Sequence, residues 1–175
     1  VVNFAYYGLV FVLSLFFQIQ QQLSPQQAGF AFLPMTIVLI GANIVAGRLI
    51  TRLGARRLMV LGLSLASVGY LLMLLASLDG RYALLIVPML MAGSGIALTI
   101  PTMTNATLSS VDQSRAGIAS GVLNSARQVG GMLGVAVFGY LVRDTATQAF
   151  MRGMYAAMGL AVMALAFGAF LCLIG

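Results

Sequence analysis

Hydrophobic residues follow one another along this chain in six long runs, separated by short breaks that carry charged residues, prolines or glycines. A helix needs about 20 apolar residues to cross the roughly 30 Å hydrocarbon core of a bilayer. The runs that reach this length lie at 4–23, 29–50, 58–77, 82–104, 116–142 and 153–174. The pattern predicts an all-α membrane protein, a bundle of six transmembrane helices. Because the breaks are short, neighbouring helices should be antiparallel.

Composition agrees with a protein that has lipid around it. Of the 175 residues, 61% are hydrophobic and only 7% are charged, and the mean hydropathy is +1.05. Soluble domains are roughly 45–50% apolar and about 25% charged. A water-soluble chain of this size cannot bury so much apolar surface, so a soluble fold is excluded.

The missing residue types exclude several kinds of chemistry. The sequence contains no His, Lys or Glu, and its three Asp fall in the breaks between helices. An intramembrane enzyme would need paired acids, a Ser/Lys or Ser/His pair, or metal ligands within the membrane. We therefore expect no enzyme, no metal site and no cofactor. The lone Cys172 excludes a disulfide framework.

The arginines predict how the chain lies in the membrane. With six crossings, the breaks near 51–57 and 109–115 share one side, which carries five arginines; the other side carries Arg81, Arg143 and Arg152. Positive residues favour the cytoplasmic side. We therefore expect a multi-pass protein of the plasma (inner) membrane with both termini of this segment in the cytoplasm. The +6 charge then reflects topology and not nucleic-acid binding. The apolar start at Val1 and the apolar end indicate a fragment of a longer protein.

Arg127 is the most unusual polar residue within a predicted helix. It lies about twelve residues into the run 116–142, roughly 18 Å along the axis and near the bilayer midplane. An arginine there costs about 2.5–3.5 kcal/mol on insertion scales, so it should face water or a protein partner. Asn124 shares its helical face and Gln128 lies beside it. One interpretation is a substrate cavity or gate; the other is that Arg127 only bonds backbone carbonyls of a neighbouring helix.

Other helices carry polar residues of the same kind. Gln18 lies on a polar stripe of 4–23 and Asn43 on a polar face of 29–50, and both are candidates for the cavity lining. Gln18 has an alternative role at the outer membrane interface. Residues 58–77 and 153–174 carry little polarity and should face lipid. The small-residue pairs Gly117 with Gly121 and Gly130 with Gly134 predict close helix packing.

The chain also shows a faint internal repeat. Gly47 and Leu49, at the end of the second helix, recur 92 positions later as Gly139 and Leu141, at the end of the fifth. Each helix is the middle member of a triplet. Secondary transporters are commonly built from inverted repeats. The recurrence predicts two inverted three-helix repeats.

Three stretches resemble a known family. The first is the run 8–18 followed by Ser24-Pro25. The second contains Gly47, Arg48, Arg52, Gly54, Arg56 and Arg57, and is similar to a glycine–aspartate–arginine loop motif. The third is 116–121 with Asn124 and Arg127-Gln128-Val129-Gly130-Gly131. Together they resemble the C-terminal six-helix half of a major facilitator superfamily transporter, most closely the fourteen-helix drug:proton antiporter family.

The resemblance implies proton-coupled efflux of amphipathic or cationic organic compounds by alternating access, a multidrug efflux antiporter. It implies as partners the bilayer, an N-terminal half of the same transporter, a small organic substrate and protons. In the family the loop motif carries an acid where this chain has Thr51. That departure weakens a gating role for Arg52 and Arg56. The alternative is a non-transporting membrane assembly partner or receptor subunit.

Overall fold

The computed structural model describes residues 1–77 and 82–174, which are almost entirely helical. The elements are α1 (Val2–Leu15), a π-helical turn (Phe16–Gln20), α2 (Pro25–Ala31), α3 (Leu33–Ala76), α4 (Tyr82–Ser109), a 3-10 turn (Gln113–Arg115), α5 (Ala116–Leu141) and α6 (Thr147–Ile174). No strand occurs within the described residues, which confirms the all-α prediction. The predicted break at 78–81 lies outside them.

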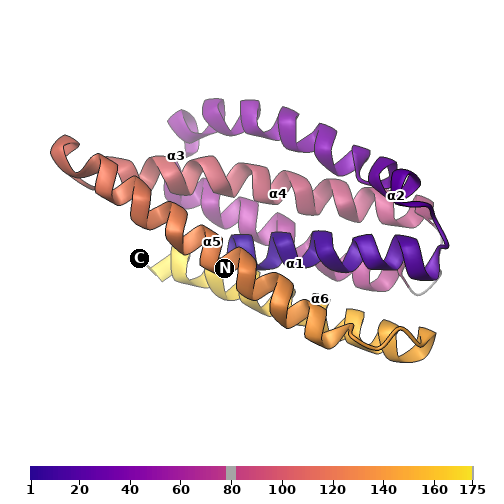
Figure 1. Cartoon of the computed structure of the whole chain (residues 1–175). Helices are drawn as coiled ribbons and strands as arrows, with labels where there is room; N and C mark the ends of the chain where they lie inside the picture. The colour runs from indigo at the N-terminus through magenta and orange to yellow at the C-terminus, as the bar shows by residue number, and fades with distance from the viewer. Residues whose placement is uncertain (78–81, 175) are drawn as a thin grey trace.

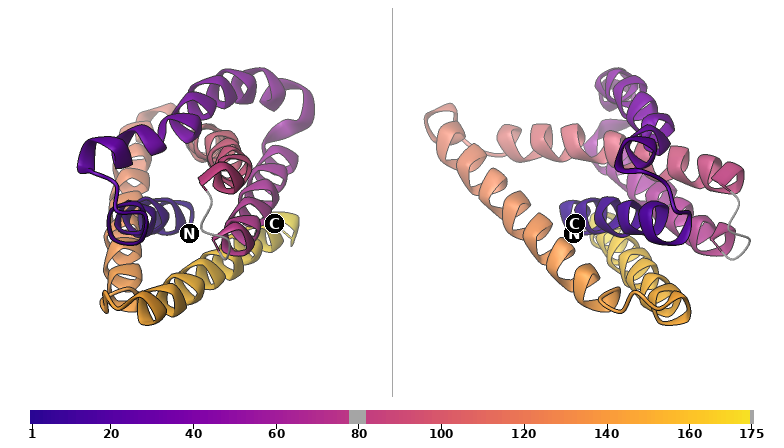
Figure 2. Two further views of the ribbon diagram at one scale, coloured as in Figure 1. Left: turned by 90° about the vertical axis from the view of Figure 1, so that its right-hand side faces the viewer. Right: turned by 45° about the vertical axis from the view of Figure 1, so that its right-hand side comes forward.

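The long helix α3 folds back on itself at Gly54 (Figures 1 and 2). Gly54 has φ 77° and ψ 160°, a conformation that side chains disfavour and glycine tolerates. The two arms of α3 both lie along α4. Met35 of the first arm contacts Gly93, and Gly62 of the second arm lies against Gly95. The break predicted over 51–57 is therefore concentrated at one residue, and α3 supplies two of the predicted crossings.

Some of the other helix ends agree with the predicted ones to within one residue, such as those of α5, whereas others differ by several residues. The predicted break at Ser24-Pro25 is present, because the Ser24 and Gln27 side chains each bond the other residue's backbone N–H at the start of α2. However, α4 continues to Ser109, and α6 begins at Thr147 and not at residue 153. Hydropathy marks the part of a helix that lies in lipid, whereas polar end residues can extend the helix into water.

Small residues bring the helices together in two similar pairs. A Cβ on Gly134 of α5 would overlap the backbone of Phe4 in α1, and one on Gly95 of α4 would overlap the backbone of Gly62. The rings of Phe4 and Phe138 meet edge to face, with centroids 5.3 Å apart. The first predicted crossing thus contacts the fifth, and the fourth contacts the third at Gly62 and the second at Met35. The two inverted three-helix repeats stay a prediction.

The outer surface of the bundle is apolar. Ile37 on the first arm of α3 is 66% exposed and Phe167 on α6 is 57% exposed. The second arm of α3 buries Tyr70 against the bundle and exposes Leu61 and Leu71, as expected for a helix that faces lipid. Such a surface suits hydrocarbon and not water.

Four helical stretches in the described residues are long and apolar enough to cross a membrane. They are Val2–Gln20, Pro25–Ala76, Tyr82–Ser109 and Thr147–Ile174. Helix α5 is 26 residues long, about 39 Å, but its Gly, Ser, Asn, Arg and Gln residues lower its hydropathy. The protein is a multi-pass membrane protein, and α5 is the long helix of the described residues that falls outside these four stretches.

Candidate functional site

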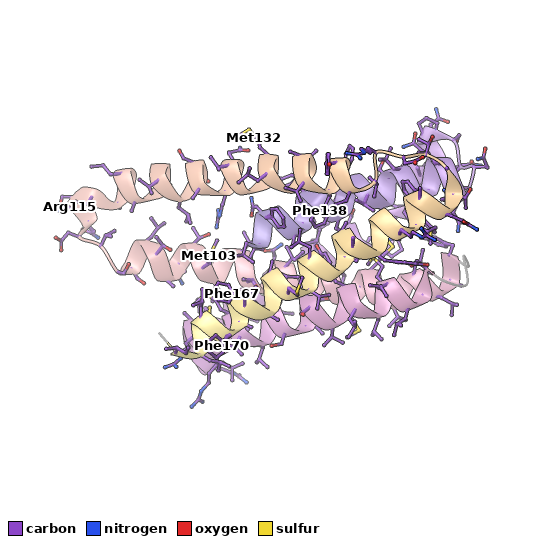
Figure 3. All side chains as sticks on the ribbon, turned by 90° about the horizontal axis from the view of Figure 1, so that it is seen from below. Met103, Arg115, Met132, Phe138, Phe167 and Phe170 are labelled. Carbon is purple, nitrogen blue, oxygen red and sulfur yellow. The ribbon has the colours of Figure 1, made fainter. Side chains whose placement is uncertain are left out.

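Helix α5 contacts the rest of the bundle along one narrow face. Its buried residues are Gly131, Gly134 and Phe138, all directed at α1. Figure 3 shows Phe138 pointing into the bundle and Met132 pointing away from it. The remaining faces of α5 are largely exposed, and they include Asn124 and Gln128. Neither amide has a hydrogen-bond partner among the described residues.

Arg127 reaches across from α5 to α4. One guanidinium nitrogen donates to the backbone carbonyl of Ile100 at 3.2 Å and also to the hydroxyl oxygen of Thr104. The Thr104 hydroxyl donates in turn to the same carbonyl at 2.8 Å. These carbonyl contacts are the ones foreseen by the interpretation in which Arg127 bonds a neighbouring helix. The guanidinium Nε is buried and has no partner in the described part of the chain.

The same arginine also borders a cavity of about 300 Å³. Its other walls are mostly apolar side chains, among them Met59, Leu63, Met103 and Leu123. Both interpretations of Arg127 therefore describe part of its surroundings. It bonds α4 through one nitrogen, and its side chain also lines the cavity.

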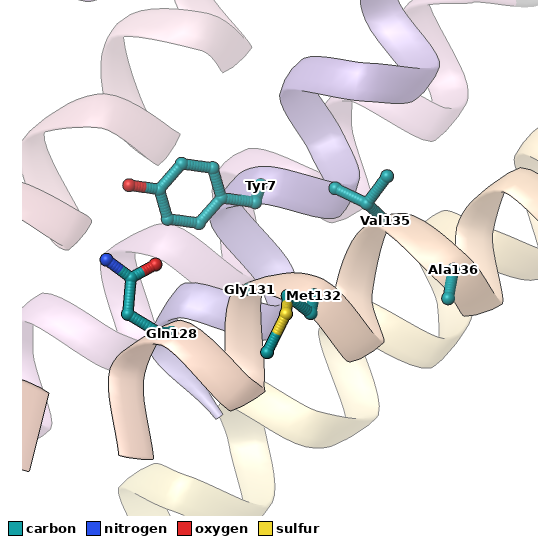
Figure 4. A pocket seen from close by; sticks show the side chains of 6 residues that line it. All are labelled: Tyr7, Gln128, Gly131, Met132, Val135 and Ala136. Carbon is teal, nitrogen blue, oxygen red and sulfur yellow. The ribbon is translucent and has the colours of Figure 1, made fainter. Parts of the chain in front are cut away.

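A second pocket lies between α1 and α5 and has a volume of about 440 Å³. It is lined by Tyr7, Gln128, Gly131, Met132, Val135 and Ala136. In Figure 4 the phenol of Tyr7 and the amide of Gln128 lie at the same side of the pocket, and the apolar residues form the remainder. No charged side chain lines it. This combination suits an organic molecule with an apolar body and a few hydrogen-bonding groups.

The five cavity candidates do not meet in one cluster. Asn124, Arg127 and Gln128 are together on α5. Gln18 lies eleven residues beyond Tyr7, about 16 Å along the helix. Its amide donates to the Ser14 carbonyl at 3.2 Å and to the Ser14 hydroxyl at 3.0 Å.

Asn43, on the exposed side of the first arm of α3, donates to the carbonyl of Leu39 at 2.7 Å. The hydrogen bonds of Gln18 and Asn43 thus connect residues four positions apart in the same stretch of helix. A common cavity that includes both of these residues remains a prediction.

The four glycines singled out for helix packing fall into two groups. Gly134 touches the backbone of α1, and Gly130 is in ordinary contact with it. A Cβ atom added to Gly117 or Gly121 would have no atom of the described neighbours within 4 Å. No close packing at these two residues is seen within the described residues, so it stays a prediction.

The arginine loop motif forms the turn between the arms of α3. Gly54 makes the turn, Gly47 is exposed, and the Thr51 hydroxyl bonds the carbonyl of Arg48 at 2.8 Å. Arg56 instead crosses to α6. Arg52 and Arg57 are exposed.

Sequence reasoning missed Tyr7 as a pocket residue and missed Ile100 and Thr104 as partners of Arg127. Tyr7 lies on the polar stripe of the first helix, which was a usable signal. Nothing in the spacing of Thr104 indicates that an arginine from another helix reaches it, because that contact depends on the tertiary arrangement.

Comparison with known proteins gives a family. Residues 1–135 match the model of the Major Facilitator Superfamily. The Methylenomycin A resistance protein of Streptomyces coelicolor is 35% identical over 82% of this chain, which corresponds to 30% of that protein. The Multidrug resistance protein Stp of Mycobacterium tuberculosis is 34% identical over 79% of the chain and 26% of its own length. The Drug efflux pump JefA of Mycobacterium tuberculosis is 30% identical over 81% of the chain and 28% of its own length.

The chain therefore spans less than a third of the length of these relatives. The family model, by contrast, matches most of the chain. The resemblance seen in the sequence is confirmed, and so are the half-bundle fold and the expectation that the chain is not an enzyme. This chain belongs to the Major Facilitator Superfamily of membrane transport proteins.

Proposed function

We propose that this chain is the C-terminal six-helix half of a secondary transporter that exports amphipathic or cationic organic compounds in exchange for protons. Its support is the family and the names of the relatives, which refer to antibiotic resistance, multidrug resistance and drug efflux. Alternating access would move the substrate between two such halves. The partner of this chain is then the N-terminal half of the same transporter.

The observation that carries the proposal is the exposed polar face of α5. Asn124 and Gln128 lie in the middle of a membrane-length helix and bond nothing in the described chain. In hydrocarbon, an unsatisfied amide costs several kcal/mol. This face should therefore meet water, substrate or the second half of the transporter. The pocket beside Tyr7 opens on the same face and offers a place for an organic substrate.

We further propose that the protein lies in the plasma membrane with both ends of this segment in the cytoplasm. The turn at Gly54, the α4–α5 connection and the end of α6 lie at one end of the bundle (Figure 1). That end carries most of the arginines, which favours the cytoplasmic side. Proton exchange would use a carboxylate elsewhere in the full-length protein, since Asp112 and Asp144 both lie between helices.

The proposal is tested with Arg127→Leu in the full-length protein. Cells that lack other exporters of a fluorescent cationic dye are loaded, and its energy-dependent efflux is followed. We expect the variant to be inserted normally and its efflux to fall at least tenfold, because the guanidinium is lost from both the α4 contact and the cavity. Collapse of the pH gradient should stop wild-type efflux.

The matched control is Arg143→Gln. Arg143 is exposed and stacks on the ring of Tyr140, 4.3 Å from its centroid, at the other end of α5. It should transport like the wild type. Undiminished efflux by Arg127→Leu would remove the role assigned to Arg127. Wild-type efflux that continues after the pH gradient has collapsed would contradict proton coupling.

A further inference from the structure

Four of the nine arginines lie within ten residues, at the turn between the arms of α3. They are Arg48, Arg52, Arg56 and Arg57, and all are exposed. Arg52 and Arg57 have no hydrogen-bond or ion-pair partner among the described residues. The turn is therefore a concentrated and uncompensated positive charge at one end of the bundle.

Arg56 is already engaged. Its Nε donates to the carbonyl of Cys172 at 2.9 Å, and a terminal nitrogen donates to the carbonyl of Leu173. These carbonyls belong to the last turn of α6, where helix carbonyls lack intrahelical partners and the helix dipole is negative. Arg56 thus ties α6 to the second arm of α3. Arg57, the next residue, remains free to bind something else.

A groove runs from this turn along the outside of the bundle. It has a volume of about 440 Å³ and is lined by Leu53, Arg56, Arg57, Val60, Leu61 and Leu173. Leu61 and Leu173 are 53% and 56% exposed. The groove is positive at the turn and apolar where it enters the membrane part of the helices. Its charged end therefore lies where the headgroup of a phospholipid would be at a membrane surface, and its apolar end lies where the acyl chains would be.

From this arrangement we infer that the groove binds an anionic phospholipid, independently of the proposed transport function. Arg57 holds the phosphate, because a guanidinium offers two parallel donors to phosphate oxygens. Arg52 adds positive charge at the same turn. One acyl chain lies along Val60, Leu61 and Leu173. A zwitterionic lipid would bring its own positive group to the arginines and would bind less tightly.

The test uses the purified full-length protein in detergent. Native mass spectrometry counts bound phosphatidylglycerol and bound phosphatidylcholine of the same chain length as each is titrated. The wild type should prefer phosphatidylglycerol. Arg57→Gln should weaken phosphatidylglycerol binding about fivefold, the effect expected for one arginine near an anionic surface. Arg57→Lys should retain most of the preference for phosphatidylglycerol, because lysine keeps the positive charge.

The matched control is Arg152→Gln, an exposed arginine near the opposite end of α6. It should bind phosphatidylglycerol like the wild type. Leu61→Asn leaves the arginines in place but removes an apolar contact with the acyl chain. It should therefore weaken the binding of both lipids. An unchanged thermal unfolding temperature shows that each variant is folded.

Two results would overturn the inference. One is equal binding of the two lipids by the wild type. The other is an Arg57→Gln variant, folded by the unfolding test, that still prefers phosphatidylglycerol as strongly. Neither result depends on transport, so the lipid site and the proposed function can fail separately.

Discussion

Helices α1 and α5 approach each other most closely at Gly134. A side chain there would meet the backbone of Phe4, which cannot move aside as a flexible side chain could. Gly121, on the same helix, has open space where its side chain would be. Two glycines of one helix thus differ only in their surroundings, and they allow a paired test of the packing.

Gly134→Ala should destabilise the protein by about 1–3 kcal/mol, because α1 and α5 must separate to admit the methyl group. Gly121→Ala should be neutral or stabilising by up to about 1 kcal/mol, since alanine favours helix. Thermal unfolding of the purified full-length protein in detergent measures both. Equal effects of the two substitutions would mean that the α1–α5 contact is not as close as described.

At the same scale, the sequence located the polar residues but not their partners. The position of Arg127 in an apolar run was enough to single it out. Its bonds to Ile100 and Thr104 depend on how α4 and α5 are inclined, which no local pattern encodes. For the same reason the sequence places Gln18 and Asn43 in one cavity with Arg127, whereas Gln18 bonds Ser14 and Asn43 bonds Leu39, each four residues away.

Among the elements, α3 shows what one glycine can do in a long helix. The two helical arms of α3 meet at one non-helical residue, Gly54, and the chain reverses direction there (Figure 1). The charged break around it predicted a loop of seven residues. Hydropathy finds where helices cross lipid; it does not show how few residues a turn needs when one of them is a glycine with positive φ.

Gly54→Ala should lower the free energy of unfolding by about 1–3 kcal/mol, since alanine is strained at φ 77° and ψ 160°. Gly41→Ala in the first arm of the same helix has open space and helical geometry, so it should not destabilise. Chemical denaturation of both variants in detergent gives the comparison. If Gly54→Ala were as stable as Gly41→Ala, the turn at Gly54 would not have the described conformation.

For the whole molecule, the proposed orientation in the membrane rests on which end of the bundle carries most of the arginines. With Cys172 and every other native cysteine of the full-length protein replaced by Ala, single cysteines at Ser114 and Thr145 report the two ends, because both residues are exposed in connections between helices. In intact cells a membrane-impermeant thiol reagent should label Thr145→Cys and not Ser114→Cys. The reverse pattern would place the termini of this segment outside.

The central claim is that the apolar helices stand in lipid and that the polar face of α5 borders an aqueous path. The direct measurement is labelling by a charged thiol reagent of Gln128→Cys and Met163→Cys in the full-length protein, each made with Cys172 and every other native cysteine replaced by Ala. Both residues are exposed in the half-bundle, but Gln128 lies beside the Tyr7 pocket and Met163, on α6, is 65% exposed on an apolar surface. We expect Gln128→Cys to react and Met163→Cys to stay unlabelled. Equal labelling of the two positions, or labelling of Met163→Cys alone, would contradict the account.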